Sequence, residues 1–248
     1  MRGAAQTETR PPGPIKAVFF DAGFTLIYSE LPLEVRCARI AREHGINVSA
    51  EQVAAVLPAA ALVMHKGYKA NPHVWSSDAT LEQHWRDYYL AIFAELGVAG
   101  DLQKCADAIY AEYNNPGVWQ LYPDVLPTLR VLHASGYLIG VISDWASSLP
   151  AKVLLPLGVG PYINFMVVSA TLREGKPGYG LYKEALERAG VGPDEAVHVG
   201  DNYTNDVLGA RSAGVAGILL DRDKSHTGPL DCPRIGSLLE LPDLLARI

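Results

Sequence analysis

The chain has 248 residues, of which 49% are hydrophobic and 19% are charged, so it can bury a full core and carry one additional domain. The formal net charge of −6 and the lack of any Lys or Arg run argue against a nucleic-acid or anionic-membrane surface. A local basic pocket for a phosphorylated small molecule is still compatible with this composition. Residues 1–14 contain no apolar segment, which argues against a signal peptide or a membrane span and predicts a disordered tail on a cytoplasmic protein.

The three cysteines, Cys37, Cys105 and Cys232, are far apart in the chain and show no CxxC spacing. No histidine stands near them at the spacing that a metal site would require. The sequence therefore predicts neither a zinc site nor a disulfide framework. We expect three small buried hydrophobic residues in a reducing compartment.

The first predicted strand is the apolar run at residues 17–20, which ends at Asp21 and is followed by Gly23. Such a run is typical of a buried parallel strand. Asp21 then stands at the carboxyl end of the strand, where open α/β sheets bind their ligands. By itself the pattern also fits an aspartate that only starts a turn.

Residues 29–119 have helical periodicity and no convincing strand. The predicted helices are residues 33–44 before Gly45, a helix opened by a capping box of Ser49 and Gln52, residues 78–96, and residues 101–113. Four helices in succession between strands predict an inserted all-helical module at residues 29–119.

From residue 122 onward, helices and strands alternate. The predicted helices are residues 123–135, 149–157, 179–189 and 206–213, and the predicted strands are residues 138–142, 165–168, 197–199 and 217–220. This alternation predicts right-handed crossovers and a parallel sheet that is covered by helices on both faces. The fold class is therefore α/β.

Polar side chains follow several of these strands. Asp21, Ser143 and Asp201 come directly after or at the end of an apolar run, and Lys176 lies in the loop after another strand. The carboxyl ends of parallel strands share one edge of a sheet, so these groups should converge on one crevice.

Asp21, Asp201 and Asp206 would bring three negative charges to that crevice, which is unfavourable unless a hard divalent cation neutralises them. The pattern predicts a Mg²⁺ site. For Asp206 a role as the N-cap of the following helix explains the spacing equally well.

A carboxylate beside Mg²⁺ can attack a phosphoryl group, and Asp21 fits this role. The backbone amides after Asp21, the hydroxyls of Thr25 and Ser143 and the ammonium of Lys176 are suitable donors to the phosphoryl oxygens. Each of these residues, taken singly, also has an ordinary structural explanation.

Four segments together carry a family resemblance: residues 21–25, 142–143, 175–177 and 200–210. In order and spacing they resemble the four motifs of the haloacid dehalogenase-like hydrolase superfamily, and the resemblance extends from residue 16 to about residue 221. It implies a Rossmann-like, doubly wound core formed by residues 15–28 and 120–248. It also implies that the helical insertion is a cap, which closes over the crevice and selects the substrate.

The resemblance implies that Asp21 is the nucleophile and also a metal ligand. It implies that the Gly23 carbonyl and Asp201 are the other metal ligands and that Asp206 supports the metal. It further implies that Thr25 and Ser143 contact the phosphoryl group and that Lys176 steadies both the nucleophile and the phosphoryl group. Gly23, Phe24, Asp144 and Asn202 are the candidate substrate-binding residues.

The sequence departs from the family pattern at two neighbouring positions. Phosphatases of the superfamily carry an acid/base aspartate where this chain has Gly23, and such a group contributes roughly 10²- to 10⁴-fold in rate. The next position, usually glycine, is Phe24, which predicts a different path for this loop. Asp144 is a candidate replacement acid, although a surface turn residue is the simpler interpretation. The other candidates are three histidines of the helical module: His65, His73 and His84.

Three hypotheses remain open at this point. The first is a Mg²⁺-dependent phosphohydrolase of a small phosphorylated metabolite. The second is a metal-free 2-haloacid dehalogenase, although that subfamily has an aromatic residue at the position of Gly23. The third is a binding protein that has lost turnover. A phosphonatase tolerates a small residue at the position of Gly23 but relies on a lysine from the module; Lys66 and Lys69 are present, and the sequence singles out neither.

Overall fold

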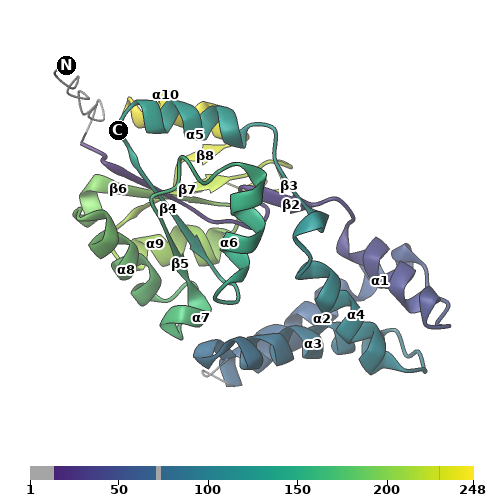
Figure 1. Cartoon of the computed structure of the whole chain (residues 1–248). Coiled ribbons are helices and arrows are strands. Elements are labelled where there is room, and N and C mark those ends of the chain that lie inside the picture. Colours follow the sequence, from purple (N-terminus) through teal and green to yellow (C-terminus); the bar gives the residue numbers. More distant parts are fainter. Residues whose placement is uncertain (1–13, 71–73, 229) are drawn as a thin grey trace, which may run out of the picture.

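The computed structural model describes residues 14–70, 74–228 and 230–248, and its centre is a six-stranded parallel sheet (Figure 1). The strands, in sheet order, are β5 (Phe165–Val168), β4 (Leu138–Ser143), β1 (Ala17–Phe20), β6 (Ala196–Gly200), β7 (Ala216–Leu220) and β8 (Arg234–Ile235). Ala17 of the central strand β1 pairs with Leu138 on one side and with Ala196 on the other. The carboxyl end of β1 therefore lies between the ends of β4 and β6.

Helices cover both faces of the sheet, as the sequence predicted. The core helices are α5 (Val125–Ala134), α6 (Leu149–Leu154), α7 (Ser169–Leu172), α8 (Tyr179–Ala189), α9 (Gly209–Ser212) and α10 (Leu241–Leu245), with a π-helical turn η5 (Tyr203–Leu208) and short 3₁₀ turns η2 (Pro116–Val118), η3 (Leu155–Leu157), η4 (Pro193–Glu195) and η6 (Leu238–Glu240). Successive β1 side chains point to opposite faces, so Phe20 packs with α5, α6 and α10, whereas Phe19 packs with α8 and α9. The sheet is therefore doubly wound.

A helical module lies beside the carboxyl ends of the strands (Figure 1). Its elements are α1 (Leu33–Glu43), α2 (Ala50–Ala70), the short 3₁₀ turn η1 (Val74–Ser76), α3 (Asp78–Glu95) and α4 (Leu102–Tyr113). These helices enclose a separate hydrophobic cluster that includes Ile40, Phe93 and Ile109. The predicted capping box opens α2, since Ser49 and Gln52 exchange backbone-to-side-chain hydrogen bonds of 2.9 and 3.2 Å.

An antiparallel ribbon joins the module to the core, and the sequence did not predict it. Strand β2 (Ile27–Ser29) pairs with β3 (Trp119–Leu121), so the entering and leaving chains lie side by side. Each strand has three residues, which is too short to show an alternating pattern.

One arginine fastens the module to this ribbon. The guanidinium of Arg36 on α1 is fully buried and bonds Ser29 Oγ on β2 and Glu112 on α4. It also lies over the ring of Tyr113 at 4.5 Å. The first and last helices of the module are therefore held to the ribbon by the same side chain.

Other sequence predictions met mixed outcomes. Strand β8 and helix α10 were missed, because a two-residue strand and a five-residue helix are too short for a periodic signal. The predicted tail falls on residues outside the described ranges, apart from Pro14. Cys37 and Cys105 are free and buried as expected, whereas Cys232 is half-buried.

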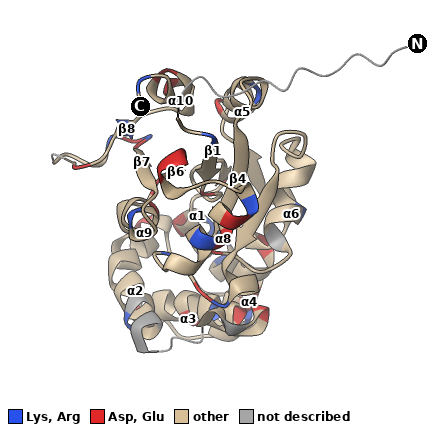
Figure 2. Ribbon diagram, turned by 90° about the vertical axis from the view of Figure 1, so that its left-hand side faces the viewer, with Lys and Arg blue, Asp and Glu red and all other residues tan. Residues whose placement is uncertain are grey.

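Two surface properties bear on possible partners. Among residues 14–70, 74–228 and 230–248, no helix has the length and apolar character that crossing a bilayer requires. In the view of Figure 2, the lysines and arginines are dispersed among acidic residues over the core and the module.

Candidate active site

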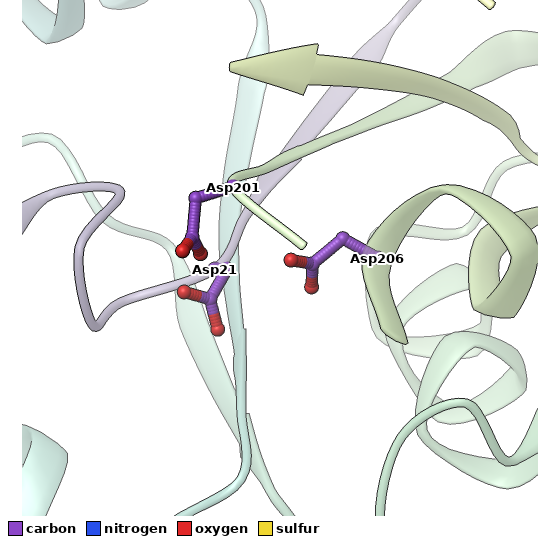
Figure 3. Close-up of side chains that lie close together, drawn as sticks. All are labelled: Asp21, Asp201 and Asp206. Carbon is purple, nitrogen blue, oxygen red and sulfur yellow. The ribbon is translucent and has the colours of Figure 1, made fainter. Parts of the chain in front are cut away.

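Three carboxylates meet at the carboxyl edge of the sheet. Asp21 follows β1, Asp201 follows β6, and Asp206 lies on η5. One oxygen from each side chain lies within 4.8 Å of the others. Figure 3 shows the three carboxyl groups directed toward a common point. The structure thus brings together side chains that are up to 185 residues apart along the chain.

Lys176 is the cation that lies inside this cluster. Its Nζ donates to Asp21 Oδ1 at 2.5 Å and to Asp206 Oδ1 at 2.7 Å. A longer contact of 3.4 Å reaches the carbonyl of Ile142. Lys176 is buried, and its single charge faces three carboxylates, so the cluster retains an excess of negative charge.

Burial, together with this excess of negative charge, shifts the pKa values of the three carboxyls. Burial raises the pKa of Asp21 to about 7, and the charges of Asp206 and Asp201 add to the effect while Lys176 opposes it. Burial also raises the pKa of Asp201 to about 6. Burial would raise the pKa of Asp206 too, but the Lys176 charge and a hydrogen bond from His198 hold it well below its usual range. Two carboxyls are therefore costly to ionise in the protein alone.

A divalent cation fits this donor set. Mg²⁺ binds through one or two carboxylates with additional oxygen ligands, and its charge would favour the ionised forms of Asp21 and Asp201. Asp206 differs from the other two carboxyls in its low pKa and shares Lys176 with Asp21. The predicted division into the ligands Asp21 and Asp201 and the supporting residue Asp206 remains a prediction.

The surroundings of Asp206 fit the predicted supporting role. Its Oδ1 also contacts His198 Nε2 at 3.1 Å, and its Oδ2 accepts from the Asn202 amide at 3.0 Å. A Cβ on Gly200 would stand 2.2 Å from the carboxyl carbon of Asp206, so this strand end has to be glycine. Both carboxylate oxygens of Asp206 are thus already hydrogen-bonded within the protein.

The N-cap interpretation of Asp206 was wrong. Asn202 caps the η5 turn, because its Oδ1 accepts from the Asn205 amide at 2.9 Å. Asp206 lies one turn further on and donates its own amide to the carbonyl of Asn202 at 2.8 Å. The predicted substrate contact of Asn202 remains a prediction.

The loop after Asp21 has a glycine-like conformation at a residue that is not glycine. Phe24 has a φ of 58°, its amide donates to the Ile27 carbonyl at 2.6 Å, and the residue is 54% exposed. A left-handed φ is unfavourable for a bulky residue, so the loop stores strain here. Thr25 is fully buried, and its hydroxyl donates to Asp201 Oδ1 at 3.4 Å.

Ser143 and Asp144 approach the site from β4. Ser143 is the buried last residue of that strand. Asp144 Oδ1 accepts from the Lys176 amide at 2.9 Å, so it ties the end of β4 to the Lys176 loop. Burial raises the pKa of the Asp144 carboxyl to about 7, although Lys176 opposes the shift. Its role as a replacement acid remains a prediction.

The helical module contains the other candidate acids, which are histidines, and the two candidate lysines of a phosphonatase. His84 is buried on α3, and burial lowers its pKa. Lys66 is exposed on α2. The side chains of His65 and Lys69, and the whole of His73, fall outside the described residues.

Several supporting residues were missed by the sequence analysis. Arg222 donates to both oxygens of Asp124 at 2.8 and 3.0 Å and to the Thr25 carbonyl at 2.8 Å, and its guanidinium lies 3.8 Å from the ring centre of Tyr122. It therefore anchors the loop after Asp21 to the start of α5. No local pattern links residues 98 positions apart, whereas His198 could have been found as the one polar residue in an apolar strand.

A hollow of about 180 Å³ adjoins the carboxylate cluster and is lined by residues that include Phe24, Tyr122, Asp201 and Arg222. Asp201 is shared between the hollow and the cluster. The hollow therefore borders the Asp201 side of the carboxylate cluster.

Comparisons with known proteins agree with this geometry. The family model of the haloacid dehalogenase-like hydrolases matches residues 15–214. Haloacid dehalogenase-like hydrolase domain-containing protein 3 of Danio rerio is 30% identical over 238 residues, which cover 95% of this chain and 97% of the relative. A glyceraldehyde 3-phosphate phosphatase of Methanothermobacter thermautotrophicus is 28% identical over 242 residues, covering 93% of this chain and all of the relative. The crystal structure of a 2-haloacid dehalogenase from Pseudomonas syringae is 26% identical, with a TM-score of 0.61, and covers 94% of this chain and 99% of its own.

Proposed function

The chain belongs to the haloacid dehalogenase-like hydrolases, and from this premise we propose that it is a Mg²⁺-dependent phosphohydrolase of a small phosphorylated metabolite. The observation that carries the proposal is the cluster of three carboxylates around Lys176. Its excess negative charge favours a cation, and a bound cation with Lys176 would in turn attract a phosphoryl group. The resemblance to a glyceraldehyde 3-phosphate phosphatase supports the same class of substrate.

The chain's own residues supply the nucleophile and the phosphoryl contacts. A carboxylate oxygen of Asp21 attacks phosphorus, the bond between phosphorus and the ester oxygen breaks, and an aspartyl-phosphate forms. Lys176 already contacts Asp21 at 2.5 Å and therefore orients the attacking carboxylate. The hydroxyls of Thr25 and Ser143 would donate to the phosphoryl oxygens.

Mg²⁺, when bound by Asp21, Asp201 and the Gly23 carbonyl, supplies charge stabilisation to the phosphoryl oxygens. Asp206 keeps Lys176 in position through its 2.7 Å ion pair. The second step is attack of water on phosphorus, which releases phosphate and regenerates the Asp21 carboxylate. Neither step has an acid/base at position 23, so the leaving group and the attacking water exchange protons with solvent or with another side chain such as Asp144.

The test is a panel of phosphate monoesters assayed with and without Mg²⁺. We expect turnover that needs Mg²⁺ and is lost in Asp21→Asn, because the amide is neither a nucleophile nor a charged ligand. Asp194→Asn is the matched control, since it removes an exposed carboxylate on η4, before β6 and away from the carboxyl edge of the sheet, and should leave turnover unchanged. Full activity of Asp21→Asn would refute the assignment of the nucleophile.

A 2-haloacid dehalogenase is the second candidate, favoured by the 26% identity to a solved dehalogenase. In that reaction Asp21 would attack carbon and displace halide without a metal. Halide release from 2-haloacids in the presence of a chelator, together with no phosphate release from the panel, would select this function instead.

A further inference from the structure

Three consecutive core residues, 145–147, each contact a different part of the helical module or its ribbon. Ser147 donates its amide to Asp78 Oδ1 at 2.8 Å and its hydroxyl to the same oxygen at 2.6 Å. Asp78 is the first residue of α3. This is a charge-assisted contact between segments 69 residues apart, which ties the module to the core.

The neighbouring residues add two apolar contacts. Ala146 packs against a cluster of Val74, Trp75 and Leu81 from the module, which also includes Ala170 of α7. Trp145 meets Trp119 of the ribbon edge-to-face, with ring centroids 5.4 Å apart. The polar and apolar contacts together form one continuous seam between the module and the core.

The core side of this seam connects directly to the candidate active site. Residues 145–147 follow Ser143 and Asp144 without a gap in the chain. The Trp145 amide donates to Ser169 Oγ at 2.9 Å, and the helix that Ser169 begins, α7, leads into the Lys176 loop. Asp144 in turn accepts from the Lys176 amide.

We propose that residues 145–147 are the seat of the helical module, and that Asp78 and Ser147 are positioning residues that couple the placement of the module to the geometry of Ser143, Asp144 and Lys176. When the module leaves its seat, Ser147 loses its two bonds to Asp78, and Ala146 loses its apolar contacts with the module. The phosphoryl-binding side chains are then less well ordered. The module therefore acts on the chemistry of the core as well as on the choice of substrate.

The first arm of the test is independent of catalysis. Hydrogen–deuterium exchange of peptides covering residues 144–150 and 168–174 is compared between the native protein and Asp78→Ala. We expect about tenfold faster exchange at the Ser147 amide, because its acceptor is gone, and unchanged exchange in β1 and β6. Asp78→Asn keeps an acceptor oxygen and should retain most of the protection. Asp87→Ala is the control, since Asp87 is exposed on the same helix and bonds only within it, to Gln83 at 2.8 Å.

The second arm is kinetic and rests on the proposed phosphohydrolase function. With acetyl phosphate, whose leaving group is too small to make many contacts with the module, Asp78→Ala should lower kcat about tenfold and change KM little. Ser147→Ala should have a smaller effect, because the hydrogen bond from the backbone amide of residue 147 to Asp78 remains. Asp87→Ala should match the native enzyme.

Each outcome decides the proposal. Unchanged exchange in both Asp78→Ala and Ser147→Ala would overturn it, whatever the activity. A kcat of Asp78→Ala equal to that of the native enzyme with acetyl phosphate would also overturn it, because the module would then not position the core. If no phosphate ester is turned over, the proposed function fails while the exchange arm still supports or refutes the seat.

Discussion

Replacing Gly23 by aspartate should convert a slow hydrolase into a faster one. The native chain has no acid to protonate the leaving oxygen and no base to activate the attacking water at this position. A positioned acid/base contributes roughly 10²- to 10⁴-fold, equivalent to about 3 to 5 kcal/mol of barrier. We expect Gly23→Asp to raise turnover within this range, most strongly for leaving groups of high pKa.

The structure indicates that the loop can accept the side chain. A Cβ built on Gly23 meets no atom within 4 Å, and Gly23 does not have a positive φ. The strained conformation lies at Phe24, the next residue, and does not need to change. The Cβ of the new side chain therefore meets no clash, and its carboxyl group would join Asp21 and Asp201, whose pKa values are already raised to about 7 and about 6.

The assay compares nitrophenyl phosphate with ethyl phosphate under pre-steady-state conditions. In the native enzyme the nitrophenolate leaves without a proton while hydrolysis of the aspartyl-phosphate is slow, so a burst of nitrophenolate should precede the steady state. In Gly23→Asp the burst should disappear and ethyl phosphate should become a substrate. Gly23→Asn is the control, because it has the same size without the acid.

A native enzyme that already hydrolyses ethyl phosphate at an ordinary rate of about 10 s⁻¹, with Gly23→Asp slower, would refute this reasoning. Another group would then supply the proton. Asp144 would be the first to test, because its pKa of about 7 lets it carry a proton near neutral pH.

Three further predictions concern stability. Phe24→Gly should be about 0.5 to 1 kcal/mol more stable than Phe24→Ala in urea unfolding, because only glycine relieves the φ of 58°, and equal stabilities would show that the loop is unstrained. Without metal, the raised pKa values of Asp21 and Asp201 mean that the folded protein binds more protons than the unfolded chain between about pH 4 and 7. The unfolding temperature should therefore fall as the pH rises through this window, less steeply in Asp21→Asn, and Mg²⁺ should raise it at pH 7. Burial alone would raise the pKa of Asp124, but its hydrogen bonds hold this pKa below 3.8. The ionised Asp124 therefore stabilises the folded protein above that pH, and this stabilisation is lost as the pH falls below it. At pH 7 Asp124→Ala should cost about 2 to 3 kcal/mol in urea unfolding, whereas Lys183→Ala, which breaks an exposed helical pair, should hardly move the midpoint.

The sheet and the meeting of its strand ends could be predicted because they depend on local patterns. Apolar runs of three to five residues indicated β1, β4, β5, β6 and β7, and parallel pairing then placed Asp21 near Asp201. The alternation of strands and helices was sufficient for the doubly wound topology.

What could not be predicted depends on contacts between distant residues. The β2–β3 ribbon, the bond from Arg222 to the Thr25 carbonyl and the contact of Ser147 with Asp78 join segments that no periodicity connects. The predicted change in the path of the Phe24 loop stays a prediction, because it depends on how this loop compares with the loops of relatives. In the structure, the hydrogen bond from the Phe24 amide to Ile27 holds a conformation that the side chain disfavours.

The β2–β3 ribbon makes the helical module a removable part of the architecture. Ser29 and Trp119 are partners in the same ladder, so the chain leaves the core and returns to it at neighbouring points. A two-residue turn could close the ribbon in place of the 89 residues between them, and the closure entropy of such a hairpin is small. Helical insertions of quite different length could therefore be grafted onto the same two strands while the sheet beneath them keeps its register. Recombination at this one junction would exchange the module and leave the sheet in place, provided that the new module also contacts residues 145–147.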